Sequence, residues 1–239
     1  MDTVMHHSET RGYANHGWLD SYHTFSFARY YNPERMNFGA LRVLNDDRVA
    51  PGQGFGTHPH DNMEIVSIPL EGDLEHQDSM GNKTVIREGD VQVMSAGTGI
   101  FHSEYNANAD KEVKFLQIWI IPNARNVEPR YDQISLRDLE EKNRFFQVLS
   151  PHRDEQGVWI YQDAWFHMGH FETGREDSYK LKKQGNGLYV FMLEGEAEMN
   201  GQLLAPRDGL GIWNEHEFRF KTTTPARVLL LEVPLESYT

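Results

Sequence analysis

The sequence of 239 residues contains no cysteine. Without thiols the chain cannot form a disulfide, an iron–sulfur cluster, a thiolate nucleophile or a thiolate zinc site. Any metal must therefore be bound through imidazole and carboxylate groups. The chain has 12 histidines and 36 acidic residues that could supply them.

Long apolar runs are also missing. The N-terminal segment MDTVMHHSETRGYANHGW lacks the apolar stretch of a secretory signal. Nowhere does the sequence reach the roughly 18 consecutive apolar residues of a membrane span. We therefore expect a cytoplasmic protein that makes no use of a membrane.

Positive charge is scarce, because 23 Lys and Arg residues face 36 Asp and Glu residues, which gives a formal net charge of −13. Binding to a phosphate backbone normally needs clustered basic residues that release counterions. The basic residues between Arg125 and Arg144 alternate with acidic ones, which is typical of a solvated connector. Direct nucleic-acid binding is therefore not predicted.

Most of the sequence consists of short runs rich in Val, Ile, Leu and aromatic residues, separated by Gly, Pro, Asn and Asp. This pattern predicts an all-β fold. Glycine-bearing turns at Gly72, Gly81 and Gly89 link several of the runs. The predicted strands are Ala40–Leu44, Glu64–Leu70, Lys83–Ile86, Val91–Met94, Val113–Ile121, Leu188–Leu193, Gly209–Trp213 and Val228–Val233.

One segment has a helical pattern. Ser135 could cap a short helix over Ser135–Lys142, with Asp138 three residues later and good helix formers after it. This segment separates two β-rich halves. We predict an N-terminal domain over 1–123, a connector with a short helix over 124–146, and a C-terminal domain over 147–239.

An internal repeat supports two copies of one barrel. Leu70-Glu71-Gly72-Asp73 recurs as Leu193-Glu194-Gly195-Glu196. In register with it, Glu88-Gly89-Asp90 and the following strand correspond to Arg207-Asp208-Gly209 and the strand Leu210–Trp213. Chance similarity between β-hairpins is the alternative explanation.

Two pairs of potential metal ligands stand at positions i and i+2. His58 and His60 follow a glycine-rich segment, and His102 and Glu104 follow another. Side chains at i and i+2 of a strand project from the same face, so each pair could converge on one ion. One such pair is weakly specific, since histidines often serve without a metal, but two pairs predict an open site of three imidazoles and one carboxylate.

The spacing resembles the cupin superfamily, in which a glycine precedes His-x-His and a glutamate and a glycine follow it. Gly52, His58, His60, Glu64 and Gly72 fit this order, and Gly89 through Asn106 resembles the second cupin motif. Ser95 stands where proline is usual, and extra residues precede His102. These departures match the pirin family, which the sequence resembles most strongly over 11–122, in the segments 16–27, 41–47, 54–60, 76–79 and 95–104.

The resemblance implies a bicupin, two antiparallel β-barrels of the jelly-roll type, with one divalent metal in the N-terminal barrel. It implies His58, His60, His102 and Glu104 as metal ligands, and iron, Fe(II), as the metal. The donor set alone equally suits Mn, Co, Ni, Cu or Zn. Glu64 is expected to form hydrogen bonds near the site without binding the metal.

Other histidines are not expected to bind a metal. His6 and His7 are expected at the surface, and His16 and His23 are expected in structural hydrogen bonds. His216 corresponds loosely to His102 in the repeat, but no His-x-His precedes it in the second half. His167 and His170 are three residues apart, which does not bring them together on a strand. The C-terminal barrel is therefore predicted to be a degenerate cupin without a metal.

The resemblance further implies a quercetin 2,3-dioxygenase, an enzyme that opens flavonols with dioxygen. Glu104 is then the candidate general base for the flavonol 3-hydroxyl, and Phe55, Phe101 and Phe38 are candidate apolar walls for the aromatic substrate. We expect a monomer. The alternatives are a non-catalytic metal-binding regulator that binds a protein partner, as other pirins do, and a metal-free cupin isomerase.

Overall fold

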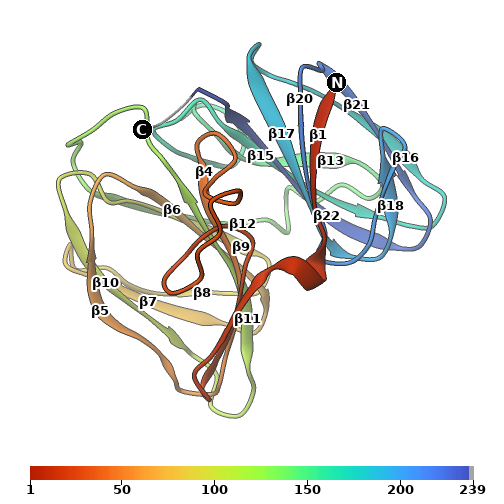
Figure 1. Cartoon of the computed structure of the whole chain (residues 1–239). Coiled ribbons are helices and arrows are strands. Elements are labelled where there is room, and N and C mark those ends of the chain that lie inside the picture. The colour runs from red at the N-terminus through yellow and green to blue at the C-terminus, as the bar shows by residue number, and fades with distance from the viewer. Residues whose placement is uncertain (237–239) are drawn as a thin grey trace.

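The computed structural model describes residues 1–236. Within that range all regular structure is β-strand except one 3-10 turn, η1 (Ser8–Thr10). Two barrels lie side by side, with warm colours in one and blue in the other (Figure 1). No helix in the described part of the chain is long and apolar enough to cross a membrane.

The first barrel pairs a seven-stranded sheet with a four-stranded sheet. The smaller sheet has the order β5-β10-β7-β8, formed by β5 (Gly54–His60), β10 (Ile100–Asn106), β7 (Leu74–Asp78) and β8 (Lys83–Ile86). The larger sheet has the order β12-β9-β6-β11-β4-β3-β2. Its strands are β12 (Arg130–Ser135), β9 (Asp90–Ser95), β6 (Glu64–Glu71), β11 (Val113–Ile120), β4 (Leu41–Val49), β3 (Leu19–His23) and β2 (Gly12–Asn15).

The second barrel repeats this plan. Its larger sheet has the order β1-β20-β17-β22-β15-β13-β14 and its smaller sheet the order β16-β21-β18-β19. The strands are β1 (Asp2–His6), β13 (Phe145–Ser150), β14 (Val158–Trp159), β15 (Trp165–Phe171), β16 (Glu176–Lys180), β17 (Asn186–Glu194), β18 (Ala197–Met199), β19 (Gln202–Leu204), β20 (Gly209–Trp213), β21 (Glu217–Thr222) and β22 (Ala226–Pro234).

Comparison of the two sheet orders confirms the internal repeat. Strands β6 and β17 hold the same place, and each ends at a glutamate before a glycine of positive φ, Gly72 (φ 76) and Gly195 (φ 73). Such a backbone conformation suits glycine, because a Cβ is disfavoured there. Strands β9 and β20 also hold matching places, as the repeat predicts.

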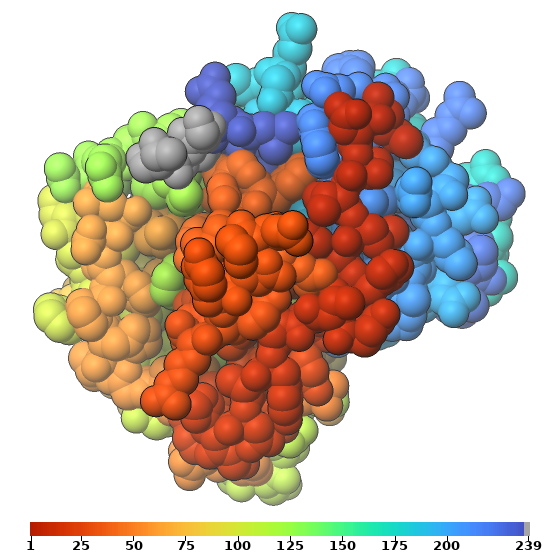
Figure 2. Space-filling model, viewed as in Figure 1, coloured from red at the N-terminus to blue at the C-terminus, as the bar shows by residue number. Residues whose placement is uncertain are grey.

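The edge strands of the two large sheets come from unexpected parts of the chain. Strand β1, at the N-terminus, pairs with β20 and lies at the edge of the second barrel, where Figure 1 shows it in red beside blue strands. Strand β12 lies in the predicted connector and occupies the matching edge of the first barrel, paired with β9. In Figure 2 the red N-terminal segment crosses from one barrel to the other. The domain division at 123 and 147 stays a prediction. Strand β1 belongs to the predicted N-terminal domain but pairs with the second barrel, and β12 belongs to the predicted connector but pairs with the first barrel.

The largest apolar core lies between the two large sheets. Along β11, Leu116, Ile118 and Ile120 belong to this shared core, together with Tyr189 and Leu229 from the second barrel. The alternate side chains of β11 point the other way, into the first barrel. One face of each central strand of the large sheet is therefore buried against the other barrel, and only the opposite face can contribute side chains to a site inside the first barrel.

The predicted helix over Ser135–Lys142 is wrong. Ser135 is the last residue of β12, and the chain then makes a single turn in which the amides of Leu139 and Glu140 donate to the carbonyl of Leu136. Leu136 is buried and its amide donates to the carbonyl of Gly89. A helix this short gains little from its own hydrogen bonds, so the pairing of β12 and the burial of Leu136 decide the conformation.

Candidate metal centre

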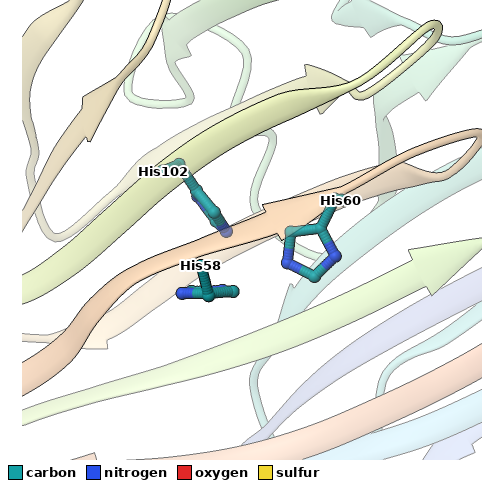
Figure 3. A group of neighbouring side chains, drawn as sticks. All are labelled: His58, His60 and His102. Atoms are coloured by element: carbon teal, nitrogen blue, oxygen red, sulfur yellow. The ribbon is translucent and has the colours of Figure 1, made fainter.

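The two predicted ligand pairs lie on neighbouring strands of the four-stranded sheet. His58 and His60 are on β5 and His102 is on β10, and the antiparallel register places His102 opposite His58. The ring centroids of His58 and His102 are 4.4 Å apart, and His60 lies 4.9 Å from each of the other two. Figure 3 shows the three rings turned toward one another inside the barrel.

These imidazoles fit a divalent metal. One ring nitrogen from each lies within 4.8 Å of the others, so three donors can approach one ion. His102 is 2% exposed, and neither of its ring nitrogens has a hydrogen-bond partner in the described part of the chain. Buried polar atoms are rarely left unpaired, so a ligand is expected there.

His60 and His102 are neutral at neutral pH, which is the form that binds a metal. Burial lowers the pKa of His102 to about 2, helped by His58 and His60. Burial also lowers the pKa of His60 to about 4, again helped by His58. The site is therefore ready to accept a cation at neutral pH.

Glu104 lies beside His102 but does not join the three histidines in one group of donors. Its donor atom lies within 4.8 Å of donors of His102 and His76 instead. Ser67 donates to Oε1 at 3.0 Å and Gln117 donates to Oε2 at 2.6 Å. Burial raises the pKa of Glu104 to about 7, although the two hydrogen bonds act in the opposite direction and lower it. The β-bulge between His102 and Glu104 explains why this pair is less regular than the sequence suggests.

His76 is the site residue that the ligand motifs did not identify. It lies on β7, fully buried, with its ring centroid 5.4 Å from that of His102. Its Nε2 lies 3.0 Å from Oδ2 of Asp78, and its Nδ1 has no partner among the described residues. Two sequence signals concerned it: the segment 76–79 is one of those that resemble the pirin family, and the His76-Gln77-Asp78 alternation places the histidine and the aspartate on one face of the strand.

Glu64 lies away from the three histidines. It is on β6, where its Oε2 accepts a hydrogen bond from Ser95 at 2.7 Å. Burial raises its pKa to about 7, opposed by this hydrogen bond and by the charge of Arg130. The geometry agrees with a hydrogen-bonding role in place of a ligand role.

A cavity of about 220 Å³ adjoins the histidines. His58, His60 and Glu104 line it from the small sheet. The inward side chains of the large sheet line it from the other side: Leu19, Ser21 and His23 on β3, Asn45 and Asp47 on β4, and Gln117 and Trp119 on β11. These are the alternate positions left free by the interface with the second barrel.

Aromatic rings form a continuous wall in this cavity, although not the predicted one. Trp119 lies edge to face with His60 at 4.9 Å and with Phe27 at 5.4 Å, and Phe27 lies 5.3 Å from His23. Of the predicted wall residues only Phe55 lines the cavity.

The other two predicted wall residues lie elsewhere. Phe101 is 55% exposed, because it alternates with inward-facing His102. Phe38 is buried between the barrels against Tyr189. Neither contributes to the cavity.

The second barrel has an apolar interior at the equivalent place. The strand registers match His58 with Tyr179, His102 with Phe218 and Glu104 with Phe220. All three replacements are buried in one apolar core. The predicted loose match of His216 with His102 is wrong. His216 is exposed and lies opposite Leu181, two residues before Phe218, which is the residue that matches His102.

Four further histidines can be compared with the sequence predictions. His6 is buried, not exposed, because β1 joins the second barrel and its Nδ1 lies 2.9 Å from the hydroxyl of Tyr189. His167 is buried against the ring of Tyr179. The Nδ1 atom of His170 lies 2.6 Å from Oε1 of Glu140. His23 has the expected hydrogen bond, with Ser21, and it also lines the cavity.

Two similar β-barrels with a convergent histidine group in the first define a bicupin with one candidate metal centre. The Pirin family model matches residues 4–120, and the model of the quercetinase C-terminal cupin domain matches residues 147–233. The chain belongs to the pirin family.

Its relatives align with most of the chain. The chain is 42% identical to the quercetin 2,3-dioxygenase of Escherichia coli K12 over 94% of this chain and 95% of that protein. It is 39% identical to a pirin-like protein of Caulobacter vibrioides over 92% of this chain and 95% of that protein. The crystal structure of the bacterial pirin YhhW from Escherichia coli with nickel(II) aligns with a TM-score of 0.92 and 40% identity, covering 98% of this chain and 99% of that one.

Proposed function

We propose that this protein is a quercetin 2,3-dioxygenase, which opens a flavonol with dioxygen. The observation that carries the proposal is the group of three buried or half-buried imidazoles at the end of an aromatic-walled cavity. Relatives of the same two-barrel length support it, because the Escherichia coli protein of that name covers almost the entire chain.

The proposed ligands are His58, His60, His102 and Glu104, and the proposed metal is Fe(II). A bound divalent ion would supply a Lewis acid and an electron donor for dioxygen chemistry. Nickel(II) in the related YhhW structure supports a divalent ion at such a site and does not select iron. Donor type alone does not select it either.

Glu104 is the proposed general base for the 3-hydroxyl of the flavonol. Its carboxylate lies on the cavity wall, and the two hydrogen bonds from Ser67 and Gln117 hold both of its oxygens in place. A base held at a fixed position beside the substrate needs little reorganisation to accept a proton.

His76 and Asp78 are proposed to orient His102. The hydrogen bond between His76 Nε2 and Asp78 holds the His76 ring in place, with its centroid 5.4 Å from that of His102. A ring fixed beside His102 limits how the His102 ring can turn, which is how residues outside the ligand set orient a ligand.

The remaining cavity residues exclude water and hold a flat ligand. Trp119, Phe27 and Phe55 present aromatic surface, and the cavity of about 220 Å³ is smaller than the roughly 300–1,000 Å³ common for ligand pockets. A flavonol would therefore fill the cavity and extend through its mouth.

The test is to load the protein anaerobically with Fe(II), measure bound metal, add quercetin and oxygen, and follow flavonol absorbance and oxygen uptake. We expect equal amounts of dioxygen consumed and carbon monoxide released, with both lost in His58→Ala and His102→Ala. His216→Ala, an exposed histidine of the second barrel, is the matched control. Bound metal without oxygen uptake on any flavonol would favour the metal-binding regulator instead.

A further inference from the structure

The edge strand β12 carries a tyrosine that is linked to the candidate metal centre through ring contacts. Tyr131 is half-buried, and its ring centroid lies 4.8 Å from that of His76 with the two planes 35° apart. The ring of His76 in turn lies 5.4 Å from that of His102. Tyr131 is not among the described residues that line the cavity, so it meets the site at His76 and not at the substrate.

The register of β12 turns Tyr131 into the first barrel. Tyr131 pairs with Met94 on β9, which belongs to a buried cluster inside that barrel. Directly paired residues of antiparallel strands point to the same face. In the small sheet His76 pairs with Thr84, and the hydroxyls of Thr84 and Tyr131 lie 2.7 Å apart. Tyr131 therefore reaches from the edge of the large sheet to the small sheet, beside His76.

Two hydrogen bonds fix the hydroxyl of Tyr131. The amide nitrogen of Gln133 donates to the carbonyl of Val85 at 3.0 Å and to Oδ2 of Asp90 at 2.9 Å, which leaves the amide oxygen of Gln133 facing Tyr131. That oxygen can only accept, so the Tyr131 hydroxyl donates to it at 2.8 Å. Thr84 then donates its hydroxyl to the Tyr131 oxygen. The ring is held in one place because its hydroxyl has both a donor and an acceptor.

The residue before Tyr131 anchors the same strand to the second barrel. Arg130 points to the opposite face of β12, where its Nη1 donates to the carbonyl of Trp159 at 2.6 Å. Its guanidinium carbon lies 3.9 Å from the centroid of the Trp159 ring. Among the described strands β12 pairs with β9 alone, because it is the edge of its sheet. Contacts on both faces therefore fix a strand that has backbone pairing on one side.

The second barrel has other residues at the matching positions. The strand registers match Tyr131 with Thr3, His76 with Met199 and His102 with Phe218. Thr3 is exposed and Met199 lies in the apolar core. The same strand order therefore folds without the tyrosine or the histidine that it contacts. Both occur in the barrel that has the candidate ligands.

We propose that Tyr131 is a positioning residue of the candidate metal centre, which holds the ring of His76 against His102 so that His102 keeps the orientation in which it binds the metal. Arg130 secures β12 from the second barrel, which gives that barrel a part in the site. The inference rests on the proposed metal ligands and does not require the proposed reaction.

The test measures metal binding by the full chain. Ni(II) is titrated calorimetrically into metal-free wild type, Tyr131→Leu and Tyr131→Phe. Residues that orient metal ligands typically change metal affinity by about 10–100-fold. We expect the Ni(II) Kd of Tyr131→Leu to rise at least about tenfold. Tyr131→Phe keeps the ring on His76 and should restore binding to within about threefold of wild type. An unchanged Kd in Tyr131→Leu would overturn the proposal.

A spectrum separates positioning from a loss of stability. At saturating Co(II) the visible ligand-field bands report the arrangement of ligands around the ion, and we expect shifted bands in Tyr131→Leu and wild-type bands in Tyr131→Phe. Tyr22→Leu is the matched control. Tyr22 is also half-buried, and its ring lies 4.9 Å from that of Tyr13 at 37°, on the face of β3 turned away from the cavity. Equal changes in Tyr22→Leu and Tyr131→Leu would contradict a positioning role.

Arg130→Met tests the part of the second barrel. Loss of the contact with Trp159 should raise the Ni(II) Kd by about two- to fivefold and shift the Co(II) bands in the same direction as Tyr131→Leu. A wild-type Kd with wild-type bands would contradict that part.

The outcomes separate this inference from the proposed function. Ni(II) binding that His102→Ala abolishes and Tyr131→Leu leaves unchanged would keep the metal centre and remove Tyr131 from it. Weaker binding with altered bands in Tyr131→Leu, together with no oxygen uptake on any flavonol, would keep the positioning role and remove the dioxygenase.

Discussion

Metal binding should stabilise the protein, and His102→Ala should remove most of that gain. A ligand that binds only the folded state at about 100 times its Kd adds about 2.7 kcal/mol to the free energy of unfolding. In a chain of this size each kcal/mol raises Tm by about 2–4 °C, so the wild type should gain about 5–11 °C. If the variant binds the metal about 100-fold more weakly, the same metal concentration stabilises it by only about 0.4 kcal/mol, which raises its Tm by about 1–2 °C.

His102 is the best position for this test because of its surroundings. It is 2% exposed and has two unpartnered ring nitrogens, so its removal takes away an unsatisfied group as well as a packed ring. These two effects oppose each other in the metal-free protein. Only the difference between metal-loaded and chelator-treated samples therefore reports on ligation.

The assay is calorimetry or dye-monitored melting with nickel(II) or anaerobic Fe(II) against a chelator, on wild type, His102→Ala and His216→Ala. His216 is exposed in the second barrel, so its variant should keep the full gain. An undiminished gain in His102→Ala would mean that the metal binds elsewhere and would refute the candidate centre.

Three further predictions concern separate parts of the molecule. Glu104→Gln keeps the shape of the side chain but removes the base, so kcat on quercetin should fall at least about 100-fold in the flavonol absorbance assay; an unchanged kcat would exclude Glu104. Asp46 lies 3.2 Å from Arg11 and 3.1 Å from Arg207 across the two barrels. Asp46→Ala should therefore lower the free energy of unfolding by about 3–5 kcal/mol in urea, because it takes from the largely buried Arg11 and the half-buried Arg207 the carboxylate that they share; a loss below about 1 kcal/mol would contradict this. Burial lowers the pKa of His167 to about 3, so the folded state resists its protonation and stability falls as the pH drops below about 6.5. Between pH 7 and pH 5 the wild type should lose about 2 kcal/mol more than His167→Phe, measured by denaturant unfolding at both pH values; equal losses would show that His167 is not the cause.

The strands of the fold were predictable because their signals are local. Lys83–Ile86 and Gly209–Trp213 form strands with the predicted bounds. In both cases a glycine turn stands next to a short run of β-formers, so the sequence itself marks where each strand begins. The repeat that predicts two barrels also rests on glycine turns, at Gly72 and Gly195.

The edge strands were not predictable in this way. Asp2–His6 and Arg130–Ser135 are polar and short, and each is held by pairing with a strand of a barrel, β20 and β9. The pairing of β1 joins residues at opposite ends of the sequence, which no local pattern encodes. For the same reason the predicted helix at Ser135 was wrong, since tertiary pairing overrides weak local propensity.

The residues of the candidate site also fall into two groups, those that a local sequence pattern predicts and those that only the tertiary structure brings together. His58, His60 and His102 stand in short motifs in which spacing alone predicts a shared face. His76, His23 and Asn45 are single polar residues on strands, and nothing in the sequence shows that β7 places His76 beside His102 or that β3 and β4 turn His23 and Asn45 toward the cavity. Sequence reasoning therefore finds the candidate metal ligands before it finds the other residues around them.

The second barrel shows that the fold does not require the metal centre. At the positions matching His58, His102 and Glu104 it has Tyr179, Phe218 and Phe220, which pack into an apolar core. The first barrel keeps buried polar groups at these positions, and an arrangement of that kind weakens a core unless a ligand satisfies it. The same strand order thus supports a stable apolar interior in one half and a ligand-dependent polar interior in the other.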